Sequence, residues 1–181
     1  KWPEVEAGLS QLKTDNKQKE YYLTDLLGWA SGAGMKISAM VAENWWEVAG
    51  VNSRLDLAEV NKSLRDETIR KLALESGVTI VDPDSTWIAP EVEIGSDTII
   101  YPGCEITGPV KIGNNAVIGP NSTIRGVVTI GDGSTVLHSF VVDSRIGADC
   151  RIGPYAHTRE GNSLSDKVRV GNFVELKKTS V

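Results

Sequence analysis

Cysteine and histidine, which often serve as nucleophiles and as zinc ligands, are scarce in this sequence. The 181 residues include two cysteines, Cys104 and Cys150, and two histidines, His138 and His157. A zinc site of the kind built on three histidines is therefore excluded, and with it a γ-type carbonic anhydrase. Both cysteines fall where a repeat places small side chains, which predicts buried fillers rather than nucleophiles.

The charge balance excludes several classes of partner. There are 19 Lys and Arg against 24 Asp and Glu, a formal net charge of −5. A non-specific nucleic-acid binder needs a basic face, so we expect no nucleic-acid partner. No apolar run approaches the roughly 20 residues that span a bilayer, so we expect no membrane partner. Two cysteines make no disulfide framework, which favours a reducing, cytoplasmic location.

The composition changes near residue 80. Residues 1–80 hold 10 Leu and 9 Ile or Val, whereas residues 81–181 hold 3 Leu and 24 Ile or Val. Leucine favours helices and β-branched residues favour strands. The sequence therefore predicts a mixed α/β first part, too small for a core of its own, and an all-β second part.

Elements of the first part follow from local patterns. Helical spacing predicts helices over 3–12, 20–31 and 55–76, and alternation predicts a strand over 35–41. The helix over 55–76 has a broad polar face, which is typical of a solvated connector. Gly77 follows it at the position where a helix commonly ends in a left-handed residue.

The second part has a period of six. Ten successive aliphatic residues share this spacing: Ile88, Ile94, Ile100, Ile106, Ile112, Ile118, Ile124, Ile130, Val136 and Val142. Four residues after each of the first nine, small or apolar side chains recur: Val92, Thr98, Cys104, Val110, Ala116, Ser122, Val128, Ser134 and Phe140. The phase then slips and resumes at Ile146 and Ile152.

This period predicts a parallel β-helix of triangular section. Each six-residue unit makes one face and one corner, three units make a coil of 18 residues, and the aliphatic side chains point inward. Gly, Asn114 or Asn115 would tolerate the positive φ of a tight corner. The hexad resembles that of hexapeptide-repeat acyltransferases, which implies a left-handed β-helix.

Four segments carry a closer resemblance, in matching order and spacing. They are Lys19–Asp25 (KEYYLTD), Val48–Leu55 (VAGVNSRL), Gly77–Pro83 (GVTIVDP) and Val170–Lys178 (VGNFVELKK). They resemble segments of bacterial bifunctional N-acetylglucosamine-1-phosphate uridyltransferases/glucosamine-1-phosphate acetyltransferases. The resemblance implies domains at 1–54 (end of a nucleotidyltransferase), 55–76 (linker helix) and 77–181 (start of an acetyltransferase β-helix).

The resemblance also implies the reactions and the site residues. Glucosamine 1-phosphate is acetylated from acetyl-CoA and then joined to UTP, which gives UDP-N-acetylglucosamine for the cell wall. Arg159 and Lys177 match residues that bind the sugar phosphate, and Glu175 is a possible sugar contact. A guanidinium and an ammonium suit a phosphate dianion. Asn52 matches an asparagine that holds Mg²⁺ and the UDP-sugar, for which an amide oxygen is suitable.

Other expectations concern catalytic groups of the family that this chain does not contain, and one position where it differs from the family. The resemblance implies that the other nucleotide-binding groups lie upstream of Lys1 and that the general-base histidine lies beyond Val181. We therefore expect no catalytic residue in this chain and no activity from it alone. Arg159 is followed by Glu160 where proline is usual, and a carboxylate beside a phosphate site is mildly unfavourable. We expect the loop from Glu160 to Lys167 to break the hexad.

Two other functions remain open on the sequence. The resemblance implies a homotrimer, so the β-helix could serve mainly as a trimerisation module. Another hexapeptide-repeat sugar nucleotidyltransferase is also possible, although it would not be expected to share the motif at 171–178.

Overall fold

The computed structural model describes residues 2–181, and contacts divide the chain into two units. One unit ends at Val48 and the other is Ala49–Val181. The division of the chain into domains at 1–54, 55–76 and 77–181 stays a prediction.

The first unit is helical. It contains α1 (Trp2–Leu9), α2 (Asp25–Gly32) and the short 3₁₀ helix η1 (Trp45–Val48). Gly8 is buried where α1 meets α2, and a Cβ there would lie 2.6 Å from the ring of Trp29. The close approach of the two helices therefore requires glycine at this position.

The strand expected over 35–41 does not form. Residues 35–42 have no regular secondary structure, and Met40 and Val41 are almost fully exposed. The described part of this unit offers no partner strand, so the backbone groups of an isolated strand would stay unpaired. Alternation of apolar residues was not enough to make a strand here.

The second unit begins with the long helix α3 (Arg54–Glu75). The Ser53 hydroxyl accepts a hydrogen bond from the Asp56 N–H, and the Asp56 carboxylate accepts one from the Ser53 N–H, which completes a capping box. The helix is followed by Gly77 at φ +68°, as expected. Its second half is not a solvated connector, because Ile69 and Leu72 are buried. It packs against the first coil of the β-helix and covers an end that would otherwise expose unpaired core.

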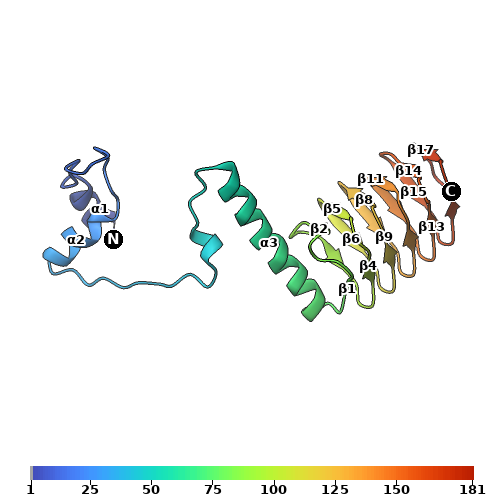
Figure 1. The fold of residues 1–181 in the computed structure, drawn as a ribbon, viewed down its shortest axis with the longest axis horizontal. Coiled ribbons are helices and arrows are strands. Elements are labelled where there is room, and N and C mark those ends of the chain that lie inside the picture. The colour runs from blue at the N-terminus through green and yellow to red at the C-terminus, as the bar shows by residue number, and fades with distance from the viewer. Residues whose placement is uncertain (1) are drawn as a thin grey trace. The chain divides into compact units, whose positions relative to one another are not determined.

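Three parallel sheets make the rest of this unit (Figure 1). The first contains β1 (Thr79–Ile80), β4 (Ile99–Ile100), β7 (Val117–Ile118), β10 (Thr135–Val136), β13 (Arg151–Ile152) and β16 (Arg169–Val170). The second contains β2 (Trp87–Ile88), β5 (Glu105–Thr107), β8 (Thr123–Arg125), β11 (Phe140–Val142), β14 (His157–Thr158) and β17 (Glu175–Leu176). The third contains β3 (Glu93–Ile94), β6 (Val110–Ile112), β9 (Val128–Ile130), β12 (Ser144–Ile146) and β15 (Asn162–Leu164).

The chain visits the three sheets in turn, so each coil contributes one strand to each sheet. This is the left-handed parallel β-helix class that the hexad implies. Nine of the ten predicted aliphatic residues, Ile88 to Val136, are at most 6% exposed and form the core. Asn115 has the positive φ expected at a corner, whereas Asn114 does not. The Asn114 side chain instead accepts a hydrogen bond from the Ser96 N–H of the preceding coil.

The tenth prediction, Val142, is wrong by one residue. Val141 is fully buried, Val142 is only half-buried and Phe140 is 52% exposed. Ser139 takes the small buried position instead. The units Val136 to Val141 and Val141 to Ile146 are each one residue shorter than the hexad, so the slip falls earlier than the sequence indicated.

The expected break at 160–167 is also wrong. Strand β15 forms there, Leu164 is 2% exposed, and the period of six continues through Thr158, Leu164, Val170 and Leu176. The period was hidden because Thr158, which is completely buried, replaces the aliphatic side chain. The last coils are therefore as regular as the first.

Candidate functional site: a cationic pair on the second sheet

Arg159 and Lys177 are neighbours on the outer face of the second sheet. In β14 and β17, His157 is paired with Glu175 and Thr158 with Leu176. Arg159 and Lys177 directly follow the inward-facing pair, and the Arg159 N–H donates to the Leu176 carbonyl at 2.8 Å. Strands in such a sheet lie about 4.8 Å apart, so the two cations extend from adjacent coils on one side. The regular coil thus brings together two residues 18 apart in sequence.

Two carboxylates lie within this pair. Arg159 Nη1 donates to Glu175 Oε1 at 3.0 Å. Glu160 Oε1 lies 3.6 Å from Lys177 Nζ, and Glu160 Oε2 lies 3.9 Å from Arg159 Nε. All four side chains are between 41% and 58% exposed, so a solute can reach them. The hydrogen bond to Glu175 and the charges of Glu160 and Glu175 raise the pKa of Arg159, which stays fully charged.

A buried amide fixes the backbone of both cationic residues. Asn162 is 3% exposed, and its side-chain NH₂ donates to the carbonyl oxygens of Arg159 and Leu176. The Asn162 amide oxygen accepts a hydrogen bond from the Thr179 N–H at 3.0 Å. Ser144, also buried, adds a hydroxyl hydrogen bond to the Arg159 carbonyl at 2.9 Å. Sequence reasoning missed Asn162, although its place two residues before an inward Leu164 is the small-residue position of the hexad.

An aromatic corner precedes the strands that the two cations follow. His138, Tyr155 and Phe173 occupy one corner of successive coils, all at positive φ. Tyr155 and Phe173 stack with centroids 5.4 Å apart, and His138 and Tyr155 are 5.5 Å apart. Phe173 is 79% exposed, which is unusual for so large an apolar side chain. A hollow of about 380 Å³ lies at this corner. It is lined by His138, Phe140, Tyr155, Ala156 and His157.

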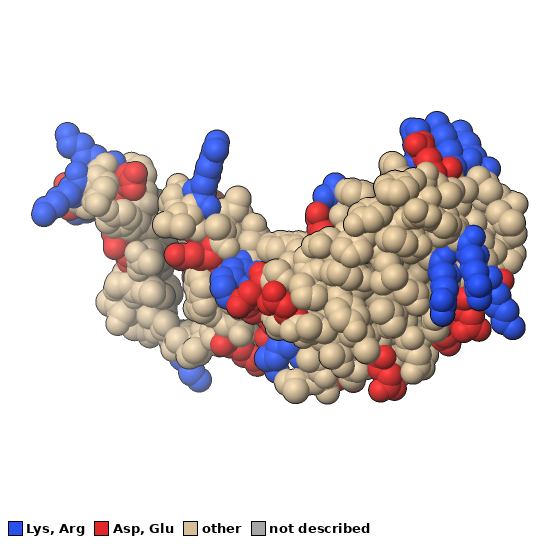
Figure 2. Space-filling model, turned by 45° about the vertical axis from the view of Figure 1, so that its right-hand side comes forward, with Lys and Arg blue, Asp and Glu red and all other residues tan. Residues whose placement is uncertain are grey.

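Charged side chains cluster at one end of the β-helix surface (Figure 2). Figure 2 shows Lys and Arg together with Asp and Glu at the right-hand end of the β-helix, beside broad uncharged areas. His157 packs edge-on against Phe140, with ring centroids 5.9 Å apart.

Asn52 lies apart from the cationic pair, before α3. The backbone N–H of Asn52 donates to Asp56 Oδ2 at 2.9 Å, and Asn52 is exposed. Across residues 2–181, no three His, Cys, Asp or Glu side chains form a metal-binding group. Mg²⁺ takes about six oxygen ligands, and one amide beside a carboxylate engaged in helix capping does not fit it. These residues alone therefore do not make a Mg²⁺ site.

The cysteines are buried, as expected. Cys104 and Cys150 are at most 1% exposed. Burial raises the pKa of the Cys104 thiol, which keeps it protonated and a poor nucleophile. Within residues 2–181, no helix is long and apolar enough to cross a bilayer.

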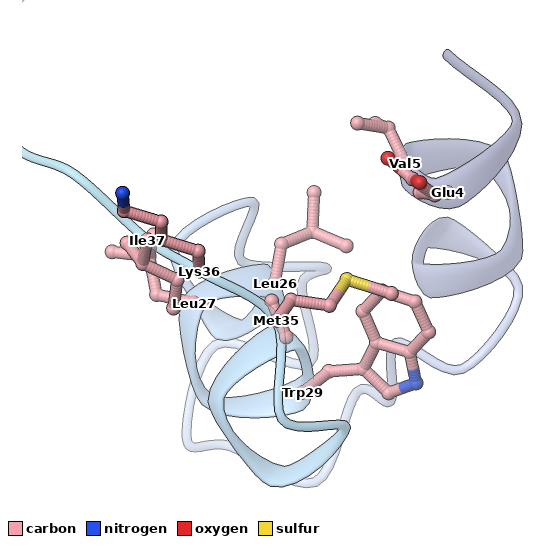
Figure 3. A pocket seen from close by; sticks show the side chains of 9 residues that line it. Glu4, Val5, Leu26, Leu27, Trp29, Met35, Lys36 and Ile37 are labelled. Atoms are coloured by element: carbon pink, nitrogen blue, oxygen red, sulfur yellow. The ribbon is translucent and has the colours of Figure 1, made fainter. Parts of the chain in front are cut away.

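The helical unit contains a separate apolar hollow of about 490 Å³ (Figure 3). Val5 of α1, Leu26 and Trp29 of α2, and Met35 after α2 contribute to its wall. None of the residues predicted to bind substrate lines it.

The fold is a hexapeptide-repeat β-helix, and it carries a pair of exposed cations beside its second sheet. The family described as "GMPPB C-terminal domain" matches residues 76–181, and the chain belongs to this family. The resemblance to the bifunctional enzymes is confirmed by relatives named "Bifunctional protein GlmU". The relative from Geobacillus sp. is 47% identical to this chain over 95% of its residues, and the relative from Clostridium perfringens is 46% identical over 97%. The relative from Corynebacterium efficiens is 44% identical over 98%.

The chain spans 37%, 38% and 36% of the length of these three relatives. The acetyltransferase domain of PglB from Neisseria gonorrhoeae, a solved structure, is 19% identical with a TM-score of 0.22. That likeness covers 67% of this chain and 63% of that one.

Proposed function

We propose that Arg159 and Lys177 anchor the phosphate of glucosamine 1-phosphate in an acetyltransferase site. The observation that carries the proposal is the pairing of Thr158 with Leu176, which puts the two cations on adjacent coils of one exposed face. A guanidinium offers a two-pronged hydrogen-bond donor and an ammonium a compact charge, and together they suit a phosphate dianion. The similarity to proteins named "Bifunctional protein GlmU" supports the same assignment.

The cations would position the substrate rather than transform it. Acetyl transfer requires the sugar amine, deprotonated by a base, to be held beside the thioester carbonyl of acetyl-CoA. Fixing the phosphate at one end of the sugar restricts where the amine lies. Glu175, held by Arg159, is the group we assign to a sugar hydroxyl. No residue of this chain is assigned as the base.

The wider activity is also a proposal. The complete enzyme would use acetyl-CoA, UTP and Mg²⁺ to make UDP-N-acetylglucosamine in the cytoplasm. Asn52 would contribute to the uridyltransferase site only with ligands from other residues, because alone it does not make a Mg²⁺ site.

A chimera tests the phosphate anchor. Residues 49–181 would replace the matching segment of a bifunctional GlmU, and both half-reactions would be assayed. Arg159→Ala and Lys177→Ala should each remove a charge-assisted contact worth roughly 1.5–3 kcal/mol. That corresponds to a fall of about 10- to 150-fold in kcat/KM for acetylation, with uridylyl transfer nearly unchanged.

Arg151→Ala is the matched control, since Arg151 is an exposed arginine on the first sheet of the same β-helix. It should leave both activities near the parent value. Equal loss of both activities in the Arg159 and Lys177 variants would indicate misfolding. Unchanged acetylation would remove these two residues from the site.

A second candidate function is assembly, with the β-helix serving to form a homotrimer. The observation that favours it is the aromatic corner of His138, Tyr155 and Phe173, because exposed aromatic clusters commonly mark protein interfaces. This function is compatible with the first.

A further inference from the structure

Glu160 places a carboxylate of the chain itself between the two cations. Its two oxygens face different partners, Lys177 Nζ at 3.6 Å and Arg159 Nε at 3.9 Å. The hydrogen bond from its own backbone N–H, together with the charges of Lys177 and Arg159, holds the pKa of Glu160 below its ordinary value. The carboxylate is therefore ionised at neutral pH.

This arrangement differs from the other ion pairs on the β-helix surface. Lys111 pairs with Glu93 at 2.9 Å, and Arg125 pairs with Glu105 at 2.7 Å, in each case one cation with one anion of the preceding coil. Glu160 instead faces two cations at once and lies on the coil of one of them. With Glu175 also bound to Arg159, the formal charges of the four groups sum to zero.

A phosphate group that approaches Arg159 and Lys177 therefore meets an occupied pair of cations. The Glu160 contacts are longer than hydrogen-bonded ion pairs, and all three side chains are exposed, so the carboxylate can be displaced. Until it moves, its negative charge repels the incoming dianion. After it moves, Arg159 and Lys177 exchange one anion for another.

We propose that Glu160 is an internal competitor of the phosphate group and sets how tightly this site holds a phosphate monoester. The proposal rests on the proposed phosphate anchor, since it assigns the affinity of that same site. A lower affinity for the phosphate group suits a site that must release a phosphate-bearing product as well as bind its substrate.

The test compares variants of the 181-residue chain by NMR titration with glucosamine 1-phosphate at fixed ionic strength. Glu160→Gln keeps the size of the side chain and removes its charge, so it should bind roughly two- to fivefold more tightly, the size expected for one exposed competing charge. Arg159→Ala should bind more weakly than the parent chain. The spectrum of each variant also reports whether it is folded.

Glu93→Gln is the matched control. It makes the same change in net charge and frees Lys111 on the third sheet, away from the proposed anchor. Its affinity for glucosamine 1-phosphate should equal that of the parent chain. An equal gain in Glu93→Gln would show a general effect of net charge and overturn the proposal.

The remaining outcomes separate the two claims. Equal affinities of Glu160→Gln and the parent chain, with binding lost in Arg159→Ala, would overturn the role of Glu160 and leave the phosphate anchor intact. Binding that does not depend on Arg159 would overturn the anchor itself. Absence of binding in both the parent chain and Glu160→Gln would overturn the proposal as well.

Discussion

The buried side-chain amide of Asn162 donates a hydrogen bond to the backbone carbonyl of Arg159. It also reaches the Leu176 carbonyl, and Leu176 directly precedes Lys177. One residue inside the β-helix therefore ties together the two strands that carry the cationic pair. Its amide is enclosed among backbone groups, where an unpaired donor or acceptor costs free energy.

Asn162→Ala should lower the free energy of unfolding by about 1–3 kcal/mol, because it leaves the Leu176 carbonyl and the Thr179 N–H without this partner. Urea denaturation followed by circular dichroism measures the change. Ser163→Ala is the control, since Ser163 is exposed and bonds through its backbone. Equal stability of the two variants would show that the amide network contributes nothing.

Ile112→Asp should destabilise the β-helix by several kcal/mol. Ile112 is 4% exposed within the core, and the change buries a charge that has no partner there. Thr129→Asp places the same side chain on the outer face of neighbouring strand β9 and should change stability little. Chemical denaturation compares the two, and a mild effect of Ile112→Asp would contradict the coil register.

The start of α3 should loosen in acid. Hydrogen bonds from the Asn52 N–H, the Ser53 hydroxyl and the Ser53 N–H lower the pKa of Asp56 from its ordinary value of 3.8. A lowered folded-state pKa gives stability that is present above pH 3.8 and is lost as the pH falls through the folded value. The protection of the Asn52 and Ser53 amides from hydrogen exchange, measured against unstructured amides at the same pH, should therefore fall below about pH 3.8.

Two variants check this assignment. Ser53→Ala should move the pKa of Asp56 back toward 3.8, and Asp56→Asn should remove the acid dependence of the protection of these amides from exchange. NMR titration of the carboxyl carbon gives the pKa directly. An Asp56 pKa that is unchanged in Ser53→Ala would contradict the capping explanation.

The chain should self-associate, and a trimer is the expected state. Phe173→Ser should shift the population toward monomer, because Phe173 is the most exposed ring of the aromatic corner. Trp87→Ser, on the first coil, is the control and should leave the mass unchanged. Light scattering during size-exclusion chromatography measures the mass, and a clean monomer of the parent chain at high concentration would contradict the prediction.

The sequence by itself determined the class of fold. A spacing of six between buried aliphatic residues has one simple geometric solution, since each face of a triangular coil must point one aliphatic side chain toward the axis. Nine of the ten predicted residues, from Ile88 to Val136, lie in that core. Cys104 and Cys150 were also correctly predicted as buried fillers, because the same spacing fixes the narrow positions.

Local sequence patterns predicted less well those features that depend on a hydrogen-bonding or packing partner elsewhere in the chain. The alternation over 35–41 predicted a strand, yet a strand requires a hydrogen-bonding partner that the sequence pattern cannot supply. The shift from Val142 to Val141 has a similar origin: two consecutive valines both satisfy the hydrophobic pattern, and only packing against Ile124 and Thr158 selects one of them.

The tertiary structure alone decided the chemistry of the candidate site. The resemblance named Arg159 and Lys177, and their spacing of 18 residues equals one coil. Because Thr158 hid the period, the sequence did not show that this coil is regular. Glu160 lies between them because of the direction that its side chain takes after β14 ends, and the sequence does not show that direction. Asn162 could not be recognised as their support, because its burial and its partners exist only once successive coils are stacked.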